Sequence, residues 1–197
     1  MVSRSNRILG LILAGGQGSR MGGVDKGMIE HKGQPLIEHV LDRLKPQCDE
    51  VVISANRNLA EYRKFNLKVI PDESSNTYDG PLAGIGSTIA HAQTTQYDLL
   101  LISSCDTPEL PYELGQRLLL AMLEQDRSSA VAHDGNHQQN LHCLIARSEW
   151  PSLIDFFRKG GRALYQWHKQ QGSIQVDFSD YARGFKNINH FNDLSDF

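Results

Sequence analysis

The chain has 197 residues, a formal net charge of −3 at pH 7 and 40% hydrophobic residues. This size allows one compact domain with a buried core, and the slightly acidic balance argues against a broad surface for DNA or RNA. No uninterrupted apolar run approaches the roughly 18 to 20 residues that cross a bilayer, and the N-terminal stretch turns glycine-rich where a signal peptide stays apolar. We therefore expect a cytoplasmic protein that binds neither nucleic acid nor membrane.

The cysteines and histidines indicate neither a disulfide framework nor a metal site. The cysteines are odd in number, lie far apart and form no CxxC pair; they are Cys48, Cys105 and Cys143. His133 and His137 flank an Asp-Gly dipeptide, which is typical of a hairpin turn. We expect a turn there and not a zinc site.

Taken in chain order, the first half of the sequence alternates short apolar runs with amphipathic segments. Residues 8–13 are a continuous apolar run of strand length, typical of a strand buried on both faces. After a glycine-rich loop, apolar residues recur at helical spacing over 36–44, with Pro35 near the first turn. The same patterns predict strands at residues 51–55, 67–70 and 98–103, and helices at residues 59–65 and 80–92.

The second half of the chain is less regular. Residues 113–125 have the spacing of a helix, and residues 130–133 and 143–146 indicate strands on either side of the Asp-Gly turn. Shorter helices are expected after Trp150 and after Gly161. We expect these elements to cover the sheet and to form the far wall of a site.

Helices between hydrophobic strands imply right-handed crossovers and a mainly parallel sheet in an α/β fold. In an open parallel sheet, ligands bind outside the carboxyl ends of the strands. Polar residues follow four of the predicted strands: the loop 15–26, Asn56 with Arg57, Asp72 and Asp106. The sequence therefore predicts one site at this edge of the sheet.

The loop at residues 13–26, LAGGQGSRMGGVDK, contains five glycines. Such loops usually bind phosphate, because exposed backbone N–H groups surround an anion that side chains would obstruct. The loop is not a P-loop, since Lys26 precedes Gly27, and Met21 stands where the dinucleotide fingerprint needs its third glycine. Arg20 and Lys26 are cations that a turn does not need, and together they can neutralise a departing pyrophosphate. The alternative is a solvated surface loop.

Asp106, in the stretch SSCDTP after the fourth predicted strand, is the candidate metal ligand. A carboxylate at the carboxyl end of a strand suits Mg²⁺, which bridges phosphates with only one or two protein carboxylates. An Asp shortly before a Pro also commonly forms a turn or caps a helix. The residue pattern by itself leaves both roles open.

Together these motifs resemble the nucleotidyltransferases that move a nucleoside monophosphate from an NTP to a phosphate-bearing acceptor. The loop with RMG followed by DK looks most like the molybdenum cofactor guanylyltransferases, the MobA group. Further motifs follow in the same order over nearly the whole chain: SANR, VIPD, DGPLAG, SSCDTP and VDFSDYARGFKNIN. The resemblance implies a Rossmann-like three-layer α/β fold, a nucleotide site at the carboxyl ends of the strands, Mg²⁺ as cofactor, and transfer of GMP from GTP to the terminal phosphate of molybdopterin or Mo-molybdopterin.

The resemblance also implies roles for individual residues. Arg20, Lys26 and Asp106 are expected to be catalytic, with Asp106 as the metal ligand. Asn187 and Asn189 are expected near the acceptor. The full set expected to bind substrates or cofactor is Leu13, Ala14, Gly15, Gly16, Lys26, Ser54, Asn56, Asp72, Gly84, Asp106, Asn187 and Asn189.

We further expect a single domain over residues 1–197, with a nucleotide-binding half at 1–110 and an acceptor-side half at 111–197. Asp72 has the chemistry to accept from the base or the ribose, although a solvated aspartate is the alternative. Arg162 is a candidate for the acceptor's phosphate. Other molybdenum-cofactor proteins and molybdoenzyme chaperones are expected as transient partners.

The chain departs from the family pattern at Ser54, where asparagine is common, so an amide contact is shorter or moves to Asn56. The FKNIN motif is followed by His-Phe where the family usually has Thr-Pro. Three alternatives therefore stay open: a molybdopterin cytidylyltransferase, another small NTP-dependent nucleotidyltransferase, and a non-catalytic GTP-binding regulator.

Overall fold

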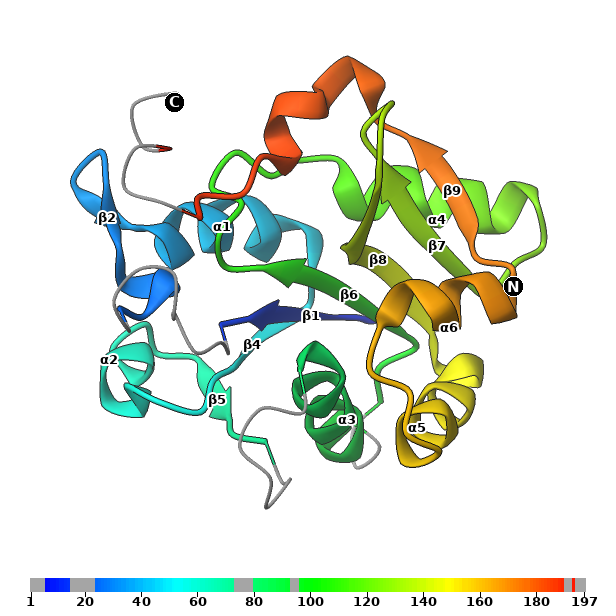
Figure 1. The fold of residues 1–197 in the computed structure, drawn as a ribbon, viewed down its shortest axis with the longest axis horizontal. Helices are drawn as coiled ribbons and strands as arrows, with labels where there is room; N and C mark the ends of the chain where they lie inside the picture. The colour runs from blue at the N-terminus through cyan, green and yellow to red at the C-terminus, as the bar shows by residue number, and fades with distance from the viewer. Residues whose placement is uncertain (1–5, 15–23, 73–79, 93–95, 190–192, 194–197) are drawn as a thin grey trace.

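The structure, a computed structural model, describes residues 6–14, 24–72, 80–92, 96–189 and 193. In this part of the chain, a seven-stranded sheet lies between two layers of helices (Figure 1). In spatial order its strands are β5 (Lys68–Ile70), β4 (Glu50–Ser54), β1 (Ile8–Leu13), β6 (Leu99–Ser104), β8 (Gln138–Ala146), β7 (Ser129–His133) and β9 (Ile174–Asp177).

The sheet is mainly parallel. β8 runs antiparallel to both of its neighbours, while the other neighbouring pairs are parallel. The carboxyl ends of β4, β1 and β6 therefore lie at one edge, toward which the arrows of β1 and β6 point in Figure 1. The predicted Rossmann-like three-layer α/β fold is confirmed.

The helices cover both faces of the sheet. α1 and α4 lie on one side, and α3, α5 and α6 lie on the other (Figure 1). The α-helices are α1 (Leu36–Leu44), α2 (Leu59–Arg63), α3 (Pro81–Ala92), α4 (Leu114–Glu124), α5 (Trp150–Arg158) and α6 (Leu164–Gln171). Short 3₁₀ helices are η2 (Lys26–Met28), η3 (Lys45–Gln47), η4 (Arg147–Glu149) and η5 (Ser179–Phe185). In the described residues, no helix is long and apolar enough to cross a membrane.

β1 is buried on both faces, which explains its continuous apolar sequence. Leu9, Leu11 and Leu13 pack in the cluster formed with α3, α5 and α6. Ile12 points to the opposite face and packs in the cluster formed with α1 and α4. Burying one such side chain completely contributes about 1.5–3 kcal/mol, so the two helix layers hold the strand in a single register.

Several elements differ from the sequence-based prediction. A small hairpin of β2 (Glu30–His31) and β3 (Gln34–Pro35) precedes α1, β8 begins well before residue 143, and β9 was not predicted. β9 lies at the sheet edge, where only part of its surface is covered, so polar residues interrupt its apolar pattern. The predicted turn between β7 and β8 is confirmed, because Asp134 Oδ1 accepts from the N–H groups of Asn136 and His137.

Candidate active site

The ends of β4, β1 and β6 meet at one level of the sheet edge. Leu13, at the end of β1, is in register with Ser54 on β4 and with Ser104 on β6. Because neighbouring strands are about 4.8 Å apart, groups at the ends of β4 and β6 lie roughly 10 Å from each other across β1. Two groups of polar side chains occupy these two positions.

The first group surrounds Asp106, in the turn directly after β6. Asp106 is 6% exposed. Its Oδ2 atom accepts from Lys26 Nζ at 3.0 Å, and its Oδ1 atom accepts from the Ser104 hydroxyl. Lys26 Nζ also donates to Asn189 Oδ1 at 2.6 Å. The tertiary structure therefore brings together three predicted site residues from the loop after β1, the end of β6 and the C-terminal segment.

The oxygen atoms of this group suit a cation. The Lys26 ammonium lies between a carboxylate oxygen of Asp106 and the amide oxygen of Asn189. The structure has no cluster of three or more His, Cys, Asp or Glu side chains placed to hold a metal in the residues it describes. Mg²⁺ needs only one or two carboxylates and completes its shell with water and phosphate oxygens, so the donor set at Asp106 fits this ion.

The buried neighbour of Lys26, Asp25, fixes the main chain next to this lysine. Asp25 is 5% exposed and accepts hydrogen bonds from the Tyr62 hydroxyl at 2.5 Å, the Asn58 amide at 3.0 Å and the Gly27 N–H at 3.3 Å. Burial raises the pKa of Tyr62, so the hydroxyl stays protonated and able to donate. These hydrogen bonds fix the backbone at the start of η2. The main chain of Lys26 is therefore held in place, which restricts where its side chain meets Asp106.

The second group, called the β4 group below, combines Asn56, two residues after β4, with Asp72, two residues after the neighbouring strand β5. The Asn56 amide donates to Asp72 Oδ2 at 2.6 Å, and the Asp72 N–H donates to Asn56 Oδ1 at 2.8 Å. Asp72 Oδ1 is buried and has no hydrogen-bond partner in the part of the chain that the structure describes. Because a buried acceptor without a donor is costly, this oxygen is a candidate acceptor for a ligand N–H or O–H.

Gly84 on α3 leaves room beside this second group. A Cβ atom at this position would lie 2.2 Å from Ser54 Oγ and 3.3 Å from Asp72 Oδ1. Ser54 is 3% exposed, so its hydroxyl cannot swing into solvent to make space. The absence of a side chain at Gly84 therefore defines the shape of the group formed by Ser54, Asn56 and Asp72.

The loop after β1 is described only at its beginning. The Ala14 N–H donates to Ser54 O at 2.8 Å, and Leu13 O accepts from the Cys105 N–H at 3.1 Å. The Ala14 N–H is thus used within the sheet, while the Leu13 carbonyl retains a second lone pair. The predicted site residues Gly15, Gly16 and Arg20 lie outside the described residues.

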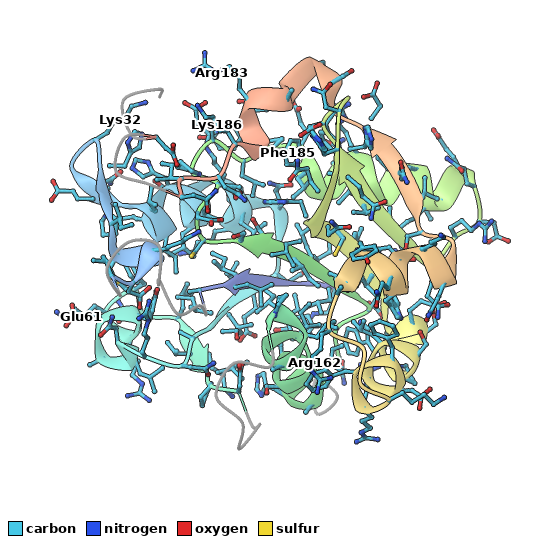
Figure 2. The ribbon with its side chains drawn as sticks, in the orientation of Figure 1. Lys32, Glu61, Arg162, Arg183, Phe185 and Lys186 are labelled. Carbon is cyan, nitrogen blue, oxygen red and sulfur yellow. The ribbon has the colours of Figure 1, made fainter. Side chains whose placement is uncertain are left out.

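The acceptor-side candidates are placed differently from one another. Asn189 belongs to the Asp106 group, as described above. Asn187 is exposed, and no hydrogen bond joins its side chain to the described residues around Asp106. Arg162, labelled in Figure 2, lies past the end of α5, where Nη1 donates to Phe157 O at 3.1 Å and Gly161 O at 2.9 Å. The structure therefore links Asn189 to Asp106 through their shared partner Lys26, whereas Arg162 bonds to the main chain past α5.

Sequence analysis missed the residues that hold the candidates in place. Asp25 precedes a helical turn, a pattern typical of an N-cap that gives a recognisable signal. Ser104 stands two residues before Asp106, within reach of a local hydrogen bond. Tyr62 gives no local signal, because it contacts Asp25 across 37 residues of sequence.

Several known proteins are similar to this chain in sequence or in fold. The family model for the MobA-like NTP transferase domain matches residues 10–173. A molybdenum cofactor guanylyltransferase from Shewanella putrefaciens is 41% identical over 187 residues, which are 95% of this chain and 94% of the relative. A protein of the same name from Pasteurella multocida is 41% identical over 184 residues, covering 93% of this chain and 95% of the relative.

A solved structure supports the fold independently. Molybdopterin-guanine dinucleotide biosynthesis protein A from Archaeoglobus fulgidus matches with a TM-score of 0.75, covers 95% of each chain and is 21% identical. At this identity the likeness shows the fold alone. The family model and the two sequence relatives establish membership: the chain belongs to the MobA-like NTP transferase domain family and, within it, to the molybdenum cofactor guanylyltransferases.

Proposed function

We propose that this protein transfers GMP from GTP to the terminal phosphate of molybdopterin or Mo-molybdopterin, forming the guanine dinucleotide cofactor and pyrophosphate. The observation that supports it most directly is the cluster of Lys26, Asp106 and Asn189 at the same sheet edge as Asp72. A nucleotide has a hydrogen-bonding base at one end and charged phosphates at the other. The β4 group offers a hydrogen-bond acceptor for the base, and the group around Asp106 offers the positive charge of Lys26 for the phosphates.

The transfer is a direct displacement at phosphorus. An oxygen of the acceptor's terminal phosphate forms a bond to the α-phosphorus of GTP, and the bond to the bridging oxygen breaks in line with it. The electron pair of that bond leaves with pyrophosphate. The acceptor phosphate is already ionised near neutral pH, so no side chain has to remove a proton. Lys26 donates to the leaving pyrophosphate, and Arg20 in the glycine loop adds a second cation.

We assign Mg²⁺ to the carboxylate of Asp106. Ser104 orients this carboxylate through Oδ1, and Asn189 places an amide oxygen close to it through their shared partner Lys26. When bound, Mg²⁺ neutralises phosphate oxygens that would otherwise repel the incoming phosphate. The side chains of the protein position the ion and the substrates, and no side chain acts as a nucleophile.

We assign the base or ribose to the β4 group. Guanine presents N–H donors at N1 and N2, and Asp72 Oδ1 is a buried acceptor in need of a donor. Asn56 fixes the other oxygen of the same carboxylate. Ser54 and Gly84 define the remaining space.

We assign the nucleotide to the half at residues 1–110 and the acceptor to the half at 111–197 of one domain. The main chain of Leu13, Ala14, Gly15 and Gly16 is proposed to approach the triphosphate, and Asn187 with Asn189 the acceptor. The hydrogen bond between Lys26 and Asn189, which come from different halves, supports our proposal that the reaction takes place between the two halves. We propose the cytoplasm as its compartment, and molybdoenzyme chaperones or other molybdenum-cofactor proteins as transient partners.

A nucleotide panel tests the proposal. Purified protein with Mg²⁺ and molybdopterin is mixed with GTP, CTP, ATP or UTP, and pyrophosphate release is measured. We expect pyrophosphate release to be fastest with GTP. A preference for CTP would indicate the cytidylyltransferase, and nucleotide binding without release would indicate the regulator.

The variant Asp106→Asn tests whether the carboxylate of Asp106 is needed for the reaction. The surface pair of Lys159 Nζ and Asp155 Oδ2, 2.7 Å apart, offers the control variant Asp155→Asn. We expect pyrophosphate release to be lost in the first variant and retained in the second. Equal pyrophosphate release by both variants would show that the carboxylate of Asp106 has no role in the reaction.

A further inference from the structure

A buried histidine lies behind the turn that presents Asp106. His142, on β8, is 2% exposed, and its Nε2 atom lies 3.0 Å from Thr107 Oγ1. Thr107 directly follows Asp106 and is fully buried. The ring of Phe185, the last residue of η5 and labelled in Figure 2, packs edge-to-face on the imidazole with centroids 5.3 Å apart. The sequence pattern gave no role to this histidine.

The hydroxyl of Thr107 links the histidine to the turn itself. Thr107 Oγ1 lies 3.1 Å from Ser104 O, and the Ser104 hydroxyl donates to Asp106 Oδ1. A threonine hydroxyl has a single proton but can accept as well as donate. If that proton goes to Ser104 O, His142 donates through Nε2–H, and every proton in the chain of hydrogen bonds has an acceptor.

The remaining ring nitrogen supports this direction. His142 Nδ1 is buried and has no hydrogen-bond partner among the described residues. With the proton on Nε2, the Nδ1 atom has a lone pair and no proton, so no N–H donor is buried without an acceptor. The opposite tautomer would bury an N–H donor without an acceptor and would leave Ser104 O without the Thr107 proton.

Burial also keeps this histidine neutral. Desolvation lowers the pKa of His142 to about 4, although the nearby negative charge of Asp106 acts in the opposite direction. A neutral imidazole adds no positive charge behind Asp106, so it does not compete with a cation bound in front of this carboxylate. His142 therefore contributes geometry to the turn without contributing charge.

We propose that His142 is a positioning residue, which holds the turn from Ser104 to Thr107 through Thr107 Oγ1 and thereby aims the carboxylate of Asp106. This inference rests on the proposed role of Asp106 in binding Mg²⁺ with the nucleotide. Partners behind a metal ligand typically change metal affinity by about 10–100-fold when they are removed. A histidine with a packing role alone would change stability and leave that affinity unaltered.

His168 provides a matched control. It is also 2% exposed, but Nδ1 lies 3.0 Å from Ser173 Oγ and Nε2 lies 3.1 Å from Asn140 O. These partners belong to the region of β8, α6 and β9, and they do not include the Asp106 turn. Replacing His168 removes buried hydrogen bonds of the same kind at a distance from the candidate active site.

The experiment compares His142→Met, His142→Gln and His168→Met. Calorimetry at a temperature where all three are folded measures the binding of GTP at a series of Mg²⁺ concentrations. We expect His142→Met to raise the Mg²⁺ concentration required for half-maximal binding about tenfold. Gln places an N–H near the position of Nε2, so His142→Gln should restore the value to within about threefold. His168→Met should lower the thermal midpoint without changing the Mg²⁺ requirement.

A second variant tests the same link if His142→Met does not fold. Thr107→Val keeps the shape of the side chain and removes the hydroxyl, so it should raise the Mg²⁺ requirement as His142→Met does. Equal Mg²⁺ requirements in the wild type and Thr107→Val would overturn the proposal, as would equal effects of His142→Met and His168→Met. The proposed reaction is tested separately, because this binding assay needs no molybdopterin and no turnover.

Discussion

Lys26 and Asp106 form an ion pair across 80 residues of sequence, with Nζ and Oδ2 3.0 Å apart. Their side chains are 29% and 9% exposed, so the carboxylate is almost enclosed while the ammonium is in partial contact with solvent. Exposed pairs typically contribute only about 0–1 kcal/mol, and the main effect of this pair is geometric. The ion pair holds the ammonium in a defined position, and such preorganisation would serve the electrostatic catalysis that we propose for Lys26.

Lys26→Met should abolish most turnover and leave the fold intact. The substitution keeps an unbranched side chain but removes the charge proposed to stabilise pyrophosphate, so we expect kcat to fall by about 10²–10³. Steady-state pyrophosphate release measures the effect. Lys64, whose ion pair with Glu61 is on the surface, provides the control Lys64→Met, which should retain full activity. A kcat within threefold of the wild type in Lys26→Met would exclude the lysine from leaving-group stabilisation.

Gly84→Ala should weaken nucleotide binding more than it reduces stability. Its Cβ would lie 2.2 Å from Ser54 Oγ and would approach Asp72 Oδ1, so we expect the KM for GTP to rise about tenfold, or roughly 1.4 kcal/mol. Gly86, on the same helix, is the control, because a Cβ there would meet Phe157 Cδ1 only at 4.0 Å.

Combining Gly84→Ala with Ser54→Gly removes the clashing hydroxyl and should recover part of the lost affinity. Gly86→Ala should leave the KM unchanged and stabilise α3 slightly, since alanine favours helix over glycine by about 1 kcal/mol. The same KM increase in both single variants would show that helix perturbation, and not the space near Ser54, causes the effect.

Tyr62→Phe should reduce activity through Asp25. It removes the buried donor to Asp25 Oδ1 at 2.5 Å and should cost about 1–3 kcal/mol of unfolding free energy. Because Asp25 fixes the start of η2, we also expect a lower kcat. Tyr97 is a matched control, since it is 4% exposed and its hydroxyl donates to Glu50 Oε2, far from η2 along the chain. Tyr97→Phe should lower the free energy of unfolding and leave kcat unchanged. Urea unfolding measures the first quantity and steady-state pyrophosphate release the second.

Stability should fall between pH 6.5 and pH 4. Burial lowers the pKa of His142 and of His168 from 6.5 to about 4, so in this range the unfolded chain binds more protons than the folded one. The contribution of each neutral histidine is complete above pH 6.5 and is lost as the pH falls toward 4. Between pH 7.5 and pH 5 we expect a loss of about 2 kcal/mol for each histidine.

Urea unfolding at the two pH values measures this loss. His168→Gln should lower stability at pH 7.5 but should show a smaller difference between the two pH values than the wild type. An unchanged pH difference in this variant would mean that His168 is already protonated in the folded protein at pH 5.

The order of most strands and helices was predictable, because each of these elements has a local cause. β1 is buried on both faces and therefore has a continuous apolar sequence, and α1 has apolar residues at helical spacing because one face is buried. The hairpin β2–β3 and the strand β9 were not predictable in this way. Their sequences are short and partly polar, and each is stabilised by pairing with another strand.

The sequence by itself determined the fold class, and it predicted that Lys26, Asp72 and Asp106 lie at the carboxyl ends of the strands, where we propose the site. It could not determine their partners, because contacts such as Lys26 with Asn189 or Tyr62 with Asp25 join residues far apart in the chain. Hydrogen-bond partners depend on distances of a few tenths of an ångström, whereas sequence patterns report only which face of an element is buried. Only the tertiary structure therefore decided that the carboxylate of Asp106 accepts from Ser104 and Lys26, and that the next residue, Thr107, is hydrogen-bonded to His142.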